Sequence, residues 1–438
     1  MSSAVFPFLK NQALFLSALS FAILSGCSPG NDEKADEPLA TEIEPSSFYD
    51  WPLFRGDPEM QGIAQEDLAA PLDIAWTFEP PVEEGKKRTP FKASPVILDG
   101  RIYVGGQDGK FFCLEVETGK SLWTFDAEGP VTAPAAVVEG KVFFGDTFGF
   151  VYGLDAASGA EIWRFEADDK VEGGINALEV DDPAVGPKEW RIFFGSHDFN
   201  LYSLAAATGE VRWKHETDNY VMATPSIEAS LPAITFGGCD GVFHILSAVT
   251  GESIHQVELG QYVANSSAIR DGIAYVAHYG GEVVAVQVES GEIVWKTATG
   301  VEYHGSPAVT AKQVIVPGTD KRLVAYDRVT GEEAWAFQGR RDFEASPVVC
   351  DSAIWIGGMD ARLYAIDPGN GEELWNFDLG TQILSSPALS RGVLVICGED
   401  GLVYGFKQAS GAQRAAESSV DADLPPAAAP AEPSPKEK

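Results

Sequence analysis

The sequence is poor in basic residues, cysteine and histidine. It has 31 Lys and Arg against 65 Asp and Glu, which gives a formal net charge of −34. Such a chain repels the phosphates of nucleic acid and anionic lipid surfaces, which argues against nucleic acid as a partner. The four cysteines after Cys27 form no CxxC or vicinal pair, and the six His lack metal-ligand spacing. We therefore expect mostly free, buried thiols, no metal and no cofactor.

Long apolar runs are also scarce. The run at residues 13–24 is too short to span a bilayer, follows Lys10 and leads directly to Leu24-Ser25-Gly26-Cys27. This motif resembles the lipobox of bacterial lipoproteins, in which the cysteine becomes the lipidated first residue. Ser28 after it, by the same resemblance, favours sorting to the outer membrane. The alternative is a plain secretory signal with a chance cysteine.

Both ends of the chain lack hydrophobic periodicity. Residues 28–48 are acidic and contain proline, which predicts a flexible tether behind the signal segment 1–27. Residues 408–438 consist largely of Ala, Pro, Ser and charged residues, which predicts a disordered tail. The expected folded domain is therefore residues 49–407.

That domain is built from one repeated unit. Residues 346–375, SPVVCDSAIWIGGMDARLYAIDPGNGEELW, recur in altered form at 306–335 and at 94–123. Each copy holds four short runs of β-branched and aromatic residues separated by Gly or Asp, which predicts one four-stranded antiparallel sheet per copy. A period of about 40 residues with four strands is typical of a β-propeller blade.

Two residue types recur at fixed places near the end of the unit. The turn between the last two strands has Gly, a residue that a tight turn with positive φ requires, and Trp follows four residues later. The Trp side chains are expected to pack between adjacent blades. They are Trp76, Trp123, Trp163, Trp213, Trp295, Trp335 and Trp375, with His255 replacing Trp in one copy.

The two ends of the domain each hold part of a unit. Ala75-Trp76-Thr77-Phe78 matches a fourth strand, whereas residues 386–406 supply three strands without a Trp strand. Together they complete one blade and remove the open sheet edge. With seven complete units, the prediction is an all-β, eight-bladed β-propeller of four-stranded antiparallel blades.

The pattern from Leu154-Asp155 through Ser158-Gly159 to Trp163 resembles the repeat of pyrroloquinoline-quinone-type propellers, over about residues 50–407. That superfamily includes quinoprotein dehydrogenases and the BamB-like lipoproteins of outer-membrane protein assembly. The repeat itself is scaffold, so the resemblance predicts the fold more strongly than the function.

Departures from the repeat mark the candidate binding face. Loops that lead from one blade to the next meet around a central mouth, and several carry charged or aromatic residues there. The alternative is a solvated rim without a ligand. The candidate residues are Lys92, Glu302, Tyr303, His304, Arg340, Arg341 and Glu344.

No Ser-His-Asp, paired-carboxylate or phosphate-binding motif remains once the repeat is explained. We therefore expect no enzyme activity and no catalytic residue. By resemblance, the protein is a scaffold anchored through lipidated Cys27, in the outer membrane facing the periplasm. Its expected partners are envelope proteins, among them the outer-membrane β-barrel assembly machine. The alternatives are a quinone-dependent dehydrogenase and a sugar- or peptide-binding propeller.

Overall fold

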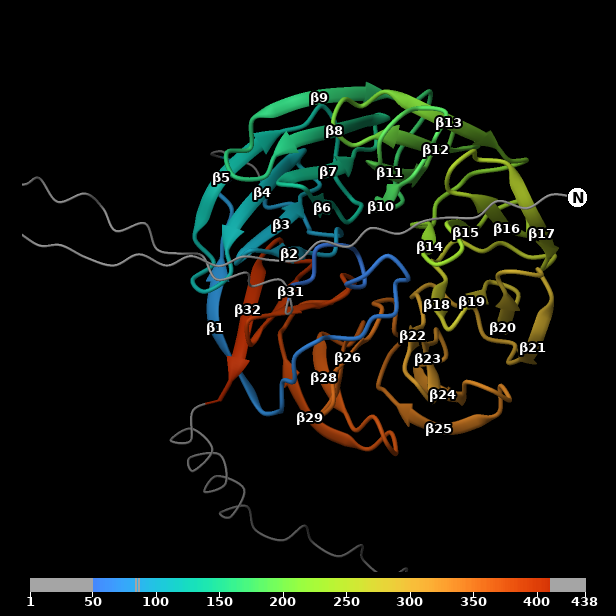
Figure 1. Ribbon diagram of the computed structural model, residues 1–438. Helices are drawn as coiled ribbons and strands as arrows, with labels where there is room; N and C mark the ends of the chain where they lie inside the picture. The colour runs from blue at the N-terminus through green and yellow to red at the C-terminus, as the bar shows by residue number, and fades with distance from the viewer. Residues whose placement is uncertain (1–49, 83–84, 86, 410–438) are drawn as a thin grey trace, which may run out of the picture. The chain divides into compact units, whose positions relative to one another are not determined.

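Eight four-stranded antiparallel sheets stand around a common centre (Figure 1). The structure, a computed structural model, describes residues 50–82, 85 and 87–409, and in these residues there are 32 strands. The predicted all-β, eight-bladed propeller is confirmed. No helix in this part of the chain is long and apolar enough to cross a membrane. Cys27, the tether and nearly all of the predicted tail lie outside the described residues.

Seven blades each use one continuous stretch of chain, with the strands in sequence order from the centre outwards (Figure 1). The first four are β2 (Val96–Leu98), β3 (Arg101–Gly105), β4 (Lys110–Glu115), β5 (Ser121–Asp126); β6 (Ala136–Val138), β7 (Lys141–Gly145), β8 (Phe150–Asp155), β9 (Glu161–Glu166); β10 (Asn176–Val180), β11 (Glu189–Gly195), β12 (Asn200–Ala205), β13 (Val211–Glu216); and β14 (Ser226–Glu228), β15 (Ala233–Gly237), β16 (Val242–Ser247), β17 (Ser253–Glu258). The next three are β18 (Ala268–Arg270), β19 (Ile273–His278), β20 (Glu282–Gln287), β21 (Ile293–Ala298); β22 (Ala308–Val309), β23 (Gln313–Pro317), β24 (Arg322–Asp327), β25 (Glu333–Gln338); and β26 (Val348–Val349), β27 (Ile354–Gly357), β28 (Arg362–Ile366), β29 (Glu373–Asp378).

The eighth blade joins the two ends of the domain, as predicted. Its strand order is β1 (Leu72–Phe78), β32 (Val403–Gln408), β31 (Val393–Cys397) and β30 (Ala388–Ser390), with β1 outermost. Trp76 lies opposite Gly405, and the register shifts between Ile74 and Trp76. Complete blades have the same shift between their third and fourth strands, as between Gly153 and Leu154 in the pairing of β8 with β9. The N-terminal strand is therefore a true fourth strand in the common register.

Each Trp of a fourth strand joins its blade to the next one. For every such Trp except Trp375, which precedes the eighth blade, the ring lies on the turn glycine of the following blade: a Cβ added to Gly209 would be 2.7 Å from the Trp163 ring, and one added to Gly159 would be 2.6 Å from Trp123. The indole N–H also donates to a carbonyl near that glycine, as from Trp163 Nε1 to Ala206 O at 3.0 Å. These glycines thus need both their positive φ and their missing side chain.

The segment before β1 crosses the centre of the ring (Figure 1) and covers the inner edges of the blades. Its carbonyls accept backbone hydrogen bonds from innermost strands, which would otherwise leave N–H groups unpaired. We call residues 50–70 the leader. The pairs are Trp51 O with Ile97 N, Pro52 O with Val137 N, Pro58 O with Ile227 N, Glu59 O with Ile269 N, Gln61 O with Val309 N, and Gly62 O with Val349 N, all at 2.8–2.9 Å.

One buried cation fastens the leader further. The Arg55 side chain is buried and donates from Nη1 to Pro347 O at 2.9 Å and from Nη2 to Pro307 O at 2.8 Å. Elsewhere the leader touches hairpins between first and second strands, as where Ser352 N donates to Asp67 Oδ1 at 2.7 Å. The leader therefore closes the centre from the face that carries those hairpins.

The leader also makes stability depend on pH. Burial raises the pKa of Asp57 to about 6, and burial with the nearby Asp57 and Glu228 charges raises that of Glu59 to about 7, while Arg270 opposes this. Both values exceed the ordinary 3.8 and 4.5, so the folded state holds these protons more tightly than the unfolded chain. Their contribution to stability is present below the ordinary values and is lost as the pH rises through about 6 and 7.

We therefore expect Glu59→Gln, which mimics the protonated acid, to raise the melting temperature at pH 8 and to leave it nearly unchanged at pH 5. Thermal unfolding of wild type and variant at both pH values measures this. The matched control is Glu302→Gln on an exposed carboxyl. An equal effect of Glu59→Gln at both pH values would show that this carboxyl does not titrate with folding.

Candidate functional site

The candidate site lies on the face opposite the leader, which we call the mouth face. It carries the loops between consecutive blades and the turns between second and third strands. A series of buried hydrogen bonds fixes these loops, because the backbone N–H of one loop donates to a hydroxyl of the next. The bonds are Gly174 N to Thr224 Oγ1, Thr224 N to Ser266 Oγ, Ser266 N to Ser306 Oγ, Ser306 N to Ser346 Oγ, Ser346 N to Ser386 Oγ and Ser386 N to Ser94 Oγ, at 2.9–3.1 Å.

This series gives a role to the Ser or Thr that stands before Pro in most copies of the unit, as in Ser346-Pro347. It also crosses the junction between the eighth blade and the first, from Ser386 to Ser94, at 2.9 Å. Because both groups of each pair are buried, losing one hydroxyl leaves an N–H unpaired. The mouth therefore rests on a rigid base.

The structure brings His304 and Glu344 together from adjacent blades. His304 Nδ1 lies 3.8 Å from Glu344 Oε1, and both side chains are about one-third exposed. The imidazole stacks on the Tyr279 ring at 5.0 Å and 26°. Tyr279 comes from the turn between β19 and β20, a position that sequence analysis did not select. The sequence signal for it is that this position, just before the turn's Asp position, varies from blade to blade, as in Cys239, Thr319 and Met359.

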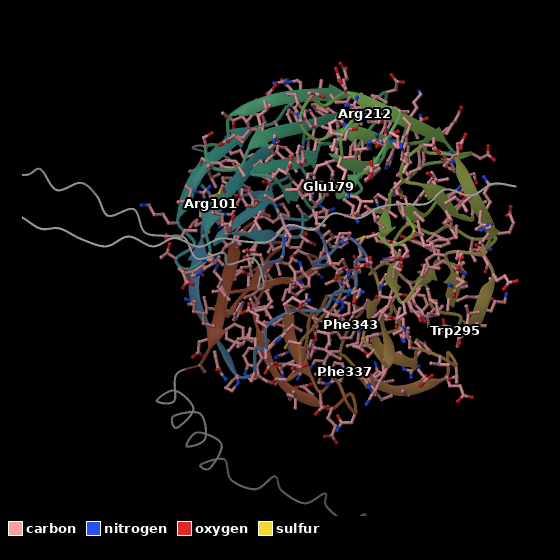
Figure 2. All side chains as sticks on the ribbon, in the orientation of Figure 1. Arg101, Glu179, Arg212, Trp295, Phe337 and Phe343 are labelled. Carbon is pink, nitrogen blue, oxygen red and sulfur yellow. The ribbon has the colours of Figure 1, made fainter. Side chains whose placement is uncertain are left out.

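Tyr303 does not contribute its side chain to this surface. Its side chain is 2% exposed, and its hydroxyl donates to Thr299 Oγ1 at 2.9 Å. It occupies the buried apolar position of the blade-to-blade loop, which is Val263 and Phe343 in the neighbouring loops. Figure 2 shows Phe343 toward the centre of the ring, whereas Trp295 lies near the rim. Comparing the loops in register would have predicted this burial.

The remaining candidates are charged and exposed. Lys92 lies close enough to Glu399 to oppose the increase in that carboxyl's pKa, which burial causes and Glu344 reinforces. Glu302, Arg340 and Arg341 are exposed, and among the described residues no hydrogen bond or ion pair joins their side chains to His304 or Glu344. The seven candidates therefore form no single cluster in the described structure.

Two residues that sequence analysis missed also make a close polar contact at the mouth. His197 Nε2 lies 3.0 Å from Glu172 Oε2, and this contact with the His197 ring lowers the pKa of Glu172 against the effect of burial. Glu172 occupies the loop position that is Lys92 and His304 in other blades, so the sequence did carry this signal. Besides the exposed Arg340 and Arg341, the mouth thus has the carboxylates of Glu172, Glu344 and Glu399 beside Lys92, His197 and His304.

The donors at the mouth do not fit a quinone cofactor. Such a group has several anionic oxygens that need fixed basic donors, and a divalent ion commonly bridges it to carboxylate and amide ligands. Lys92 is exposed, and the carboxylates of Glu172 and Glu399 lie close enough to feel its charge. In the described part of the chain, no group of three or more His, Cys, Asp or Glu side chains could hold a metal ion.

Comparison with known proteins gives one family. The model of the outer membrane protein assembly factor BamB matches residues 73–220, 239–354 and 340–415. No curated protein sequence matches the chain.

Solved structures confirm the fold. BamB from Moraxella catarrhalis superimposes with a TM-score of 0.64 at 19% identity, covering 77% of this chain and 98% of that one. Quinohemoprotein alcohol dehydrogenase from Comamonas testosteroni gives 0.67 at 15% identity, covering 82% and 81%. A europium-containing methanol dehydrogenase gives 0.67 at 12% identity, covering 82% and 98%. At these identities the likeness concerns the fold and does not separate scaffold from enzyme.

Proposed function

The chain belongs to the family of the outer membrane protein assembly factor BamB, and from this membership we propose a non-catalytic, lipid-anchored propeller that binds proteins in the bacterial envelope. The match over most of the propeller is the observation that carries the proposal. The rigid mouth face supports it, because a fixed surface binds a protein at low entropic cost. The proposed location is the outer membrane, facing the periplasm.

The direct test is crosslinking in native membranes, followed by purification of the protein and identification of what is attached to it. We expect envelope proteins, with subunits of the outer-membrane β-barrel assembly machine among them. The same experiment on cells that lack the protein gives the background. Recovery of no envelope protein above that background would contradict the proposal.

The lipid anchor predicts a complete effect of one substitution. Cys27→Ser removes the thiol that a lipoprotein would acylate within Leu24-Ser25-Gly26-Cys27. We expect wild type to incorporate a radioactive fatty acid and Cys27→Ser to incorporate none, with the variant released from membranes or left unprocessed. Cys239→Ser is the matched control. Equal labelling of wild type and Cys27→Ser would exclude this anchor.

The competing proposal is a quinone-dependent dehydrogenase, because the two dehydrogenases have the same fold as this chain. From the excess of carboxylates at the mouth, we expect no heat of binding on titration with pyrroloquinoline quinone and calcium. We also expect no dye-linked turnover of alcohols or sugars. Micromolar binding together with turnover would replace the scaffold by the enzyme and make Lys92, Glu302, His304 and Glu344 site residues.

A further inference from the structure

Two exposed phenylalanines depart from the turn chemistry of the repeat, on neighbouring blades of the mouth face. The turn between second and third strands has Asp at 108, 198, 240, 320, 360 and 400. The Asp oxygen accepts the backbone N–H two residues later, as from Val242 to Asp240 at 3.0 Å and from Leu402 to Asp400 at 3.1 Å. Glycine commonly follows, because the next residue has positive φ.

Phe148 occupies the Asp position of its turn. A different residue, Asp146, supplies the carboxylate that accepts the hydrogen bonds of this turn. Asp146, two residues earlier, accepts from Phe148 N and Phe150 N at 2.9 Å and from the Tyr152 hydroxyl at 2.9 Å. Asp198 does the same for Asn200 N and the Tyr202 hydroxyl in the next blade. Asp146 thus makes the hydrogen bonds that the turn Asp makes in other blades, and the side chain at position 148 is not needed for them. Folding does not explain why a phenylalanine there is 64% exposed.

Phe199 occupies the position that is glycine in most blades. Its φ is +71°, a conformation that costs a residue with a side chain about 1–2 kcal/mol. The ring is 39% exposed and lies 5.3 Å from the Tyr220 ring, which is 41% exposed. Tyr220 in turn stacks on His197 at 4.7 Å. A strained residue that exposes an aromatic ring indicates a function other than folding.

These aromatic residues lie on connected loops. A Cβ on Gly149 would be 2.8 Å from Asp169 O, and Asp168 N donates to Asp198 Oδ2 at 3.1 Å. The loop that follows β13 is hydrogen-bonded to the next blade, because Cys239 N in the turn between β15 and β16 donates to Tyr220 O at 3.1 Å. Tyr262, 57% exposed, follows on the next loop. We define the aromatic arc as Phe148, Phe199, Tyr220 and Tyr262.

Acidic residues surround the arc. Loops 127–135, 167–175, 217–225 and 259–267 contain Glu128, Asp168, Asp169, Glu172 and Asp218, and their sequence includes Lys170 as the one lysine or arginine. Guanidinium and ammonium groups stack on aromatic rings and pair with carboxylates, so this surface complements a basic segment. The carboxylates around the arc repel a second copy of this chain, which has a formal net charge of −34. They also repel the acidic residues 28–48.

We propose that the aromatic arc docks a basic, aromatic-containing segment of a partner polypeptide. The arginine or lysine side chains of that segment lie on the rings and pair with Asp168, Asp169 and Asp218, and its aromatic side chains stack against the exposed rings beside them. This assignment rests on the proposed protein-binding function and specifies the face and the chemistry of the partner.

The test uses the full-length protein in detergent at physiological salt, with the labelled peptide (Arg-Phe)4 as the probe in fluorescence anisotropy. The variant Phe148→Ser/Phe199→Gly removes two rings and relieves the positive φ, so it keeps or raises the melting temperature. We expect it to bind the probe at least about tenfold more weakly than wild type. Ala361→Gly, at the equivalent turn position with φ +67°, and the exposed Val329→Ser are the matched controls and bind as wild type does.

Three results would overturn the proposal. One is binding of the variant within twofold of wild type. Another is equal affinity of wild type for (Arg-Gly)4 and (Arg-Phe)4, which would show charge attraction alone. The third is displacement of the probe by a neutral oligosaccharide such as cellohexaose, which would assign the arc to glycans.

Native-membrane crosslinking separates this proposal from the broader function. If wild type captures envelope proteins and the variant captures the same ones equally, the arc is not their docking surface although the protein-binding function stands. If wild type captures none, the proposed function itself fails. Loss of the main captured protein in the variant, but not in Ala361→Gly, supports both.

Discussion

A chain that lacks residues 50–78 is expected to lose cooperative unfolding or to melt at least about 10 °C below the full chain. The deletion removes the outermost strand of the eighth blade, together with the buried rings of Trp76 and Phe78, each of which contributes about 3–5 kcal/mol. It also removes the leader carbonyls that pair with six innermost strands. Thermal unfolding followed by circular dichroism measures the change.

The matched control is a chain ending at Ala409, which keeps all of β32. We expect its melting temperature to stay within about 2 °C of the full chain. A melting temperature of the 50–78 deletion close to that of this control would mean that neither the leader nor β1 stabilises the ring.

Trp163→Ala is expected to lower the free energy of unfolding by about 3–5 kcal/mol. The substitution empties the space above Gly209, removes the stacking with Phe143 at 5.6 Å and leaves Ala206 O without its indole donor. Trp163→Phe keeps most of the ring and should lose about 1 kcal/mol for the hydrogen bond. Urea unfolding of the three proteins gives the values.

His255 is the one position where the fourth-strand Trp is replaced, so introducing Trp there tests the same contact in the opposite direction. His255 lies on Gly291 and places Nε2 2.9 Å from Glu289 O, so it occupies the Trp position with a smaller ring. We expect His255→Trp to stabilise the protein by about 1 kcal/mol.

For the Trp163 variants, one outcome would contradict the prediction. If Trp163→Ala lowers the free energy of unfolding no more than Trp163→Phe does, the ring contact between blades is not what stabilises them.

The candidate site was harder to predict than the fold. Lys92, His304 and Glu344 were recognised because charged residues stand out in loops that are otherwise small and apolar. Tyr303 was selected for its chemistry, but its loop position is buried, at 2% exposure. Phe148 and Phe199 were not selected, because their meaning depends on knowing that Asp146 has replaced the turn carboxylate and that residue 199 has φ +71°.

The sequence by itself determined the number of blades, the four strands of each and the joining of Trp76 to residues 386–406. It did so because each blade repeats the same local hairpins, so a period of about 40 residues reports them directly. Tertiary structure alone decided that Arg55 reaches Pro347 O, 292 residues away, and that a hydroxyl in six of the loops between blades binds the loop before it. Such contacts join segments that are distant in sequence, and a local pattern of apolar and turn residues carries no information about which distant groups will meet.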